Sequence, residues 1–147
     1  MSVSIFLSGS SVTEGSTTSD PFNLQWTITL SAASTEPVTV DYRFLSGTGQ
    51  AGEDAFLTSG MTEPLSVTFE AGETSKTVTY KVNADFTDEV DETIILEAFS
   101  PEGATLAGNQ PVLRSTGWIL DDDGTESNLA LFVSRPQVVE GDTGTQQ

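Results

Sequence analysis

The chain has 147 residues, and its 22 acidic side chains against five basic ones and no histidine give a formal charge of −17. This charge disfavours binding to nucleic acid and to anionic membranes, because too few cations are available to pair with phosphate. The absence of cysteine excludes disulfides and thiolate metal sites. The excess of carboxylates suits either a solubilising surface or a protein that binds cations.

The length and apolar content favour one folded domain of ordinary size. Hydrophobic residues make up 36% of the chain, and it holds eight Phe, two Trp and two Tyr, more than a disordered acidic segment would carry. No stretch reaches the roughly 18 apolar residues of a membrane span, so we expect no membrane insertion. The start, MSVSIFLSGSSV, has no basic beginning or long apolar run and is not expected to be a signal peptide.

Alternating apolar residues predict about seven short strands. The first, over residues 3–12, contains a glycine break that suggests a bulge. The clearest lies in FNLQWTITLS (residues 22–31), where every second residue is apolar. Trp26 and Trp118 are expected in the core. Further strands are predicted over residues 37–44, 65–69, 76–82, 93–99 and 112–120, and 93–99 is apolar enough for a central strand covered on both faces.

Turn residues separate these strands, and no segment shows a helical period. The turn clusters lie at residues 34–37, 46–52, 71–74 and 101–108. Short strands with such turns are typical of an all-β fold, here an antiparallel Greek-key β-sandwich of about seven strands.

A short internal repeat predicts a second copy of the domain. IFLSGSSVTEG begins at Ile5 and LFVSRPQVVEG begins at Leu131, so the two stretches match without a gap at an offset of 131 − 5 = 126 residues. We therefore expect a domain over residues 1–124, a linker over 125–128 and the truncated first strand of a following repeat over 129–147. The parent protein would then carry such domains in tandem.

The acidic residues gather where predicted strands end. DFTDEVDE (residues 85–92) holds five acids, DDD occupies 121–123, Glu53 and Asp54 lie in a glycine-rich loop, and Glu14 ends the first strand. In a Greek-key sandwich of alternating strands these four places lie at one end of the molecule. The topology therefore predicts one acidic rim.

Carboxylates so close together repel one another, and a bound cation would remove that cost. Ca²⁺ fits best, because it takes six to eight oxygen ligands in flexible geometry. Zinc would want histidine or cysteine, and magnesium prefers fewer protein ligands and more water. Shared carboxylates favour more than one Ca²⁺ ion.

Several motifs together resemble the Calx-beta domain. They are VTEG, GTGQAGED, FEAGETSKTVTYKV, DFTDEVDETIILEAFSPEGATL and GWILDDDG, and they cover roughly residues 3–124. The family is similar to immunoglobulin-like sandwiches. It is known from the calcium-sensing segment of sodium–calcium exchangers and from extracellular adhesion-type proteins, often in tandem.

The resemblance implies a set of metal ligands at the acidic rim. These are Glu14, Asp54, Asp85, the carbonyl of Thr87, Glu89, Glu92, Asp121, Asp122 and Asp123. Asp88 and Asp91 are expected to be rim charge. Two departures from the family pattern, Ala84 in place of a first aspartate and Ala55 in place of an aromatic, imply fewer ions or weaker binding.

The leading functional hypothesis is a non-catalytic calcium-binding module of a tandem extracellular or cell-surface protein. Ca²⁺ would order the rim and stiffen the junction to the neighbouring Calx-beta-like domain. A calcium-sensing regulatory domain is one alternative. A module that binds a cell-surface or carbohydrate ligand is another, which an exposed Trp or Tyr beside the rim would favour. An enzyme is least expected, because neither histidine nor a nucleophile motif is present.

Overall fold

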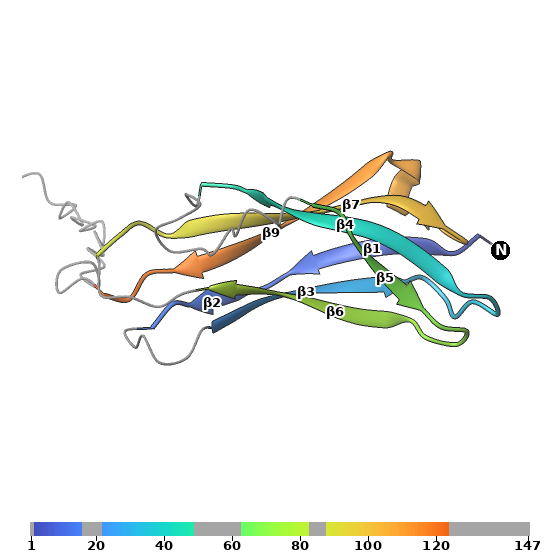
Figure 1. The fold of residues 1–147 in the computed structure, drawn as a ribbon, viewed down its shortest axis with the longest axis horizontal. Coiled ribbons are helices and arrows are strands. Elements are labelled where there is room, and N and C mark those ends of the chain that lie inside the picture. The colour runs from blue at the N-terminus through green and yellow to red at the C-terminus, as the bar shows by residue number, and fades with distance from the viewer. Residues whose placement is uncertain (1, 16–21, 49–62, 83–87, 124–147) are drawn as a thin grey trace, which may run out of the picture.

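The computed structural model describes residues 2–15, 22–48, 63–82 and 88–123, and these segments form a β-sandwich of two facing sheets (Figure 1). One sheet has the strand order β6-β3-β1-β8 and the other β2-β9-β7-β4-β5. The strands are β1 (Ser4–Gly9), β2 (Ser11–Thr13), β3 (Phe22–Leu30), β4 (Val38–Ser46), β5 (Leu65–Phe69), β6 (Ser75–Val82), β7 (Glu92–Glu102), β8 (Thr105–Leu106) and β9 (Val112–Leu120). The predicted all-β sandwich is confirmed.

A single 3-10 turn, η1 (Ala107–Asn109), is the helical element of the described segments. Within those segments, no helix is long and apolar enough to cross a membrane.

The first predicted strand is divided between the two sheets. β1 pairs antiparallel with β3, whereas β2 pairs parallel with β9. Ser10 joins them: its N–H donates to the Gln25 carbonyl of one sheet, and its own carbonyl accepts from the Trp118 N–H of the other, both at 3.1 Å. The expected bulge is therefore wrong, since the glycine break marks a crossing between sheets. The remaining pairs are antiparallel as predicted, and the short pairs β1–β8 and β2–β9 are parallel.

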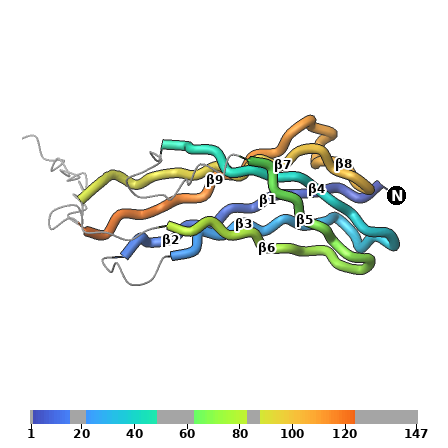
Figure 2. The backbone as a smooth tube through the Cα atoms, in the orientation of Figure 1, coloured from blue at the N-terminus to red at the C-terminus, as the bar shows by residue number. Residues whose placement is uncertain are grey.

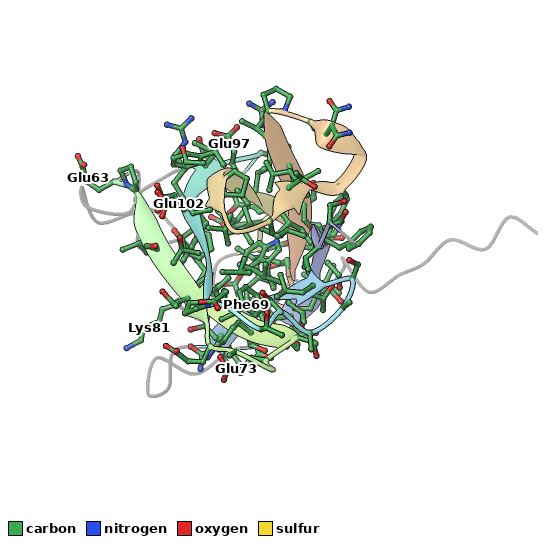
Figure 3. All side chains as sticks on the ribbon, turned by 90° about the vertical axis from the view of Figure 1, so that its right-hand side faces the viewer. Glu63, Phe69, Glu73, Lys81, Glu97 and Glu102 are labelled. Atoms are coloured by element: carbon green, nitrogen blue, oxygen red, sulfur yellow. The ribbon has the colours of Figure 1, made fainter. Side chains whose placement is uncertain are left out.

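The core follows the alternation seen in the sequence. Leu24, Trp26, Ile28 and Leu30 of β3 are buried between the sheets, and the Trp26 indole N–H donates to the Ser115 carbonyl of the facing sheet at 3.0 Å. Phe69 lies between the sheets as well, whereas Lys81 points away from the sandwich (Figure 3). Burial of these apolar faces is the main stabilising contribution to the fold.

Trp118 is 49% exposed, so its predicted place in the core is wrong. The residue of β9 that faces Trp26 is Gly117, where a Cβ would lie only 2.5 Å from a Trp26 ring carbon. Because Trp26 fills the space that Gly117 leaves, the alternation of β9 places Trp118 on the outer face of its sheet.

β7 is the central strand of its sheet, as predicted, and its outer face carries a buried carboxylate. Glu97 is 1% exposed and lies between Arg43 of β4 and Arg114 of β9, its neighbours across the sheet. The Nε atoms of these arginines donate to Glu97 at 2.9 Å and 2.7 Å. The Arg43 guanidinium also lies 5.3 Å from the centre of the Phe99 ring. The triad of Glu97, Arg43 and Arg114 therefore connects the three adjacent strands β4, β7 and β9 through their side chains.

Replacing Glu97 by Gln should lower the free energy of unfolding at pH 7 by about 2 kcal/mol, because charge-assisted hydrogen bonds to both arginines are lost. Burial raises the pKa of Glu97, but hydrogen bonds and charge from Arg43 and Arg114 outweigh it, and the net pKa lies below the usual 4.5. The stabilisation is thus fully present above about pH 4.5 and lost as pH falls through the lowered pKa of the folded state. Denaturant titrations of wild type and Glu97→Gln, from pH 7 down to strongly acidic pH, measure this stabilisation.

The exposed Glu63 provides the control, since Glu63→Gln removes the same charge without a buried partner. If the difference in free energy of unfolding between wild type and Glu97→Gln stayed constant down to strongly acidic pH, the role of the triad would be contradicted.

Candidate metal centre

The end of β2, the start of β7 and the end of β9 lie together at the end of the sandwich opposite the N-terminus (Figures 1 and 2). These three strand ends carry Glu14, Glu92 and residues 121–123. The predicted convergence of acidic segments is therefore confirmed for the described residues.

The parallel pairing of β2 with β9 places Glu14 beside Asp121. Thr13 is opposite Leu120 in the register, and the next N–H, that of Glu14, donates to the Leu120 carbonyl at 3.0 Å. The side chains two positions earlier, Val12 and Ile119, pack into the core. Because side chains alternate along a strand, Glu14 and Asp121 point inward between the sheets, and Glu14 is only 3% exposed.

Glu92 faces the same interior. It is paired with Ile119 in the register of β7 and β9, and it stands two residues before the buried Ile94. The preceding residue, Asp91, has a different role: its Oδ1 accepts a hydrogen bond from the Asp121 N–H at 3.1 Å. Asp91 thus ties the segment before β7 to the end of β9, and its expected role as rim charge stays a prediction.

Asp122 turns toward β2. Its Oδ1 accepts a hydrogen bond from the Gly15 N–H at 2.8 Å. Gly15 has φ +75°, a conformation that favours glycine. One oxygen of Asp122 therefore holds the end of β2 in place.

Asp121 Oδ1 and Asp123 Oδ2 are buried and accept no hydrogen bond from the residues that the structure describes. Among the described arginines and lysines, none forms an ion pair with the aspartates of 121–123. A buried carboxylate oxygen without a donor is costly, and proteins compensate it with an opposite charge or a metal ion.

Tyr80 of β6 reaches this end from the facing sheet, and sequence reasoning assigned it only to an alternating strand. It is fully buried. Burial, and then the charge of Glu92, raise the pKa of Tyr80 to about 12. Tyr80 stands near the end of β6 and Glu92 at the start of β7, so the two facing sheets bring them to the same end of the core. Only the three-dimensional structure could disclose this relation.

Four of the predicted site positions need separate mention. Asp54, Asp85 and Thr87, like the departures Ala55 and Ala84, lie outside the described residues. Glu89 lies in the described segment before β7 and is partly buried, and its role as a ligand stays a prediction. The described residues alone contain no group of three or more acidic, histidine or cysteine side chains close enough to form a complete ion site.

The Calx-beta domain model matches residues 3–123 of the chain. The chain belongs to the Calx-beta domain family. A sequence comparison with curated proteins finds no match.

Three solved structures share the fold of this Calx-beta domain. The apo-form Calx CBD1 domain is 22% identical, with a TM-score of 0.59 over 84% of this chain and 100% of that one. CBD12 from CALX1.2 is 22% identical, with a TM-score of 0.61 over 82% of this chain and 44% of that one. The calcium binding domain CBD12 of CALX1.1 is 24% identical, with a TM-score of 0.60 over 80% and 45%. The chain thus spans less than half of the two CBD12 structures.

Replacing Asp122 by Ala should lower the free energy of unfolding by about 1–2 kcal/mol without added metal, because the Gly15 N–H loses its acceptor. Asp122→Asn keeps an oxygen in place and should recover most of that loss. Chemical denaturation of the two variants measures this directly. Equal destabilisation by both would show that the carboxylate acts by charge instead of as the acceptor for Gly15.

Proposed function

We propose that this Calx-beta domain is a non-catalytic module that binds Ca²⁺ at the end of the sandwich formed by β2, β7 and β9. The observation that carries the proposal is the pair of buried aspartate oxygens, Asp121 Oδ1 and Asp123 Oδ2, that accept no hydrogen bond from the described residues. Bound calcium would neutralise them and replace the hydration that burial removes.

The donor set fits calcium better than other common ions. Glu14, Glu92, Asp121 and Asp123 come from three strands and offer hard carboxylate oxygens, which Ca²⁺ accepts in flexible geometry. The second oxygen of Asp122 adds a further donor. The remaining ligands would be Glu89, Asp54, Asp85 and the Thr87 carbonyl. More than one ion would share the carboxylates.

The proposed setting is an extracellular or cell-surface protein with neighbouring Calx-beta-like domains in the same chain. The repeated stretch from Leu131 and the short interval after Asp123 support it. Calcium at the end of β9 would then lie at the root of the linker and stiffen the junction.

A sensing role is distinguished by affinity, since micromolar binding favours a sensor and near-millimolar binding favours a structural extracellular site.

Recognition of a cell-surface or carbohydrate ligand is a second candidate function, and the 49% exposure of Trp118 favours it. Trp118 stands three positions before Asp121 on the outer face of β9, and exposed tryptophan is a common anchor in binding surfaces. A panel of glycans tested against wild type and Trp118→Ala decides the matter. Binding that Trp118→Ala leaves unchanged, or no binding at all, would remove this candidate.

Calcium should stabilise the domain, because it binds the folded form only. At about 100 times the dissociation constant, Ca²⁺ would add about 2.7 kcal/mol to the free energy of unfolding and raise Tm, with Mg²⁺ giving a smaller shift. The double variant Asp121→Asn, Asp123→Asn should lose most of that gain while its metal-free Tm stays equal or rises, because carboxylate repulsion is removed. Calorimetric titration and thermal melting measure both quantities.

The double variant Asp41→Asn, Glu36→Gln is the matched control, since it also loses two negative charges. Asp41 lies within β4 and the exposed Glu36 just before it, away from the ends of β2, β7 and β9. If millimolar Ca²⁺ neither binds to wild type nor raises its Tm more than Mg²⁺ does, the proposed function is wrong.

A further inference from the structure

Tyr80 connects the apolar core to the candidate metal centre. It belongs to β6 and is opposite Leu24 of β3. Its ring packs edge-on against Phe44 at 5.1 Å between ring centres, and the side chain is fully buried. The ring therefore has an ordinary packing role, which phenylalanine could fill equally well.

The hydroxyl of Tyr80 has no such explanation. It is buried and makes no hydrogen bond with the residues that the structure describes. A hydroxyl in that state destabilises the fold, because its desolvation is not compensated. A tyrosine whose hydroxyl serves only the fold would be expected to have a partner there.

Glu92 faces the same space between the sheets, because it stands two residues before the buried Ile94 and side chains alternate along β7. After the larger effect of burial, the charge of Glu92 also raises the pKa of Tyr80. The two side chains come from different sheets, Tyr80 from β6 and Glu92 from the first position of β7. Since the phenol stays protonated at neutral pH, it can donate a hydrogen bond to a carboxylate and cannot compete with it for a cation.

We propose that Tyr80 is a positioning residue of the calcium site, whose hydroxyl donates a hydrogen bond to the Glu92 carboxylate when calcium is bound. This inference rests on the proposed function. The hydrogen bond fixes the orientation of Glu92 from the opposite sheet, so that the carboxylate presents its other oxygen to the ion. The cost of the buried hydroxyl in the metal-free protein is thereby recovered on binding.

Tyr80→Phe tests this with the loss of one oxygen atom and no change in ring packing. The variant should bind Ca²⁺ about tenfold more weakly, the effect expected for a lost hydrogen bond to a charged group. Its metal-free Tm should be equal to or higher than that of wild type. Calorimetric titration with Ca²⁺ and melting with and without the ion, all on the full chain, give both readouts.

Tyr42→Phe is the matched control. Tyr42 also packs edge-on against Phe44, at 5.8 Å between ring centres. It is paired with Ala98, six positions along β7 from Glu92, so it lies away from the proposed site. This variant should leave the calcium affinity unchanged.

The outcomes separate the inference from the proposed function. Wild type that fails to bind Ca²⁺ overturns the proposed function itself. Wild type that binds, together with Tyr80→Phe that binds equally well, overturns only the role of Tyr80. A lower metal-free Tm with unchanged affinity shows that the hydroxyl serves the fold, and it likewise overturns the inference.

Discussion

The parallel pairing of β2 with β9 is the constraint on which the acidic end of the molecule depends. Ser10 hydrogen-bonds both sheets and lets the chain leave β1 for the facing sheet after only one residue. Had the first strand continued beside β3, Glu14 would end in the other sheet. Because β2 instead runs alongside β9, both strands end at the same level, and Glu14 lies beside the first of the three aspartates. A three-residue strand therefore determines the composition of the site.

Much of this arrangement could be predicted from the sequence, because strand alternation and turn residues are local signals. The position of Trp118 could not. VLRSTGWIL carries apolar residues on both faces of the strand, and the choice between them depends on Gly117 receiving the Trp26 ring from a segment about 90 residues away. The crossing at Ser10 is equally non-local, since a glycine break has the same sequence pattern whether the strand bulges or changes sheet.

The candidate site shows the same division between local and long-range information. Chain topology alone brought Glu14 and residues 121–123 to one end, as predicted. The orientation of Asp122 depends on a hydrogen bond to Gly15, 107 positions away in sequence. The relation between Tyr80 and Glu92 depends on two sheets facing each other. Neither of these two relations changes the local sequence pattern around its residues, so the sequence alone could not reveal them.

The molecule contains two kinds of buried carboxylate, and the contrast between them supports a cation at the acidic end. Glu97 is enclosed in the outer face of its sheet, and two arginines supply its hydrogen bonds and neutralise its charge. Asp121 and Asp123 have buried oxygens too, yet no described arginine or lysine pairs with them. With five basic residues against 22 acidic ones, the chain has little cationic charge left to offer. The proposed calcium ion would provide for the aspartates what Arg43 and Arg114 provide for Glu97, with the difference that its stabilisation would vary with the ion's concentration.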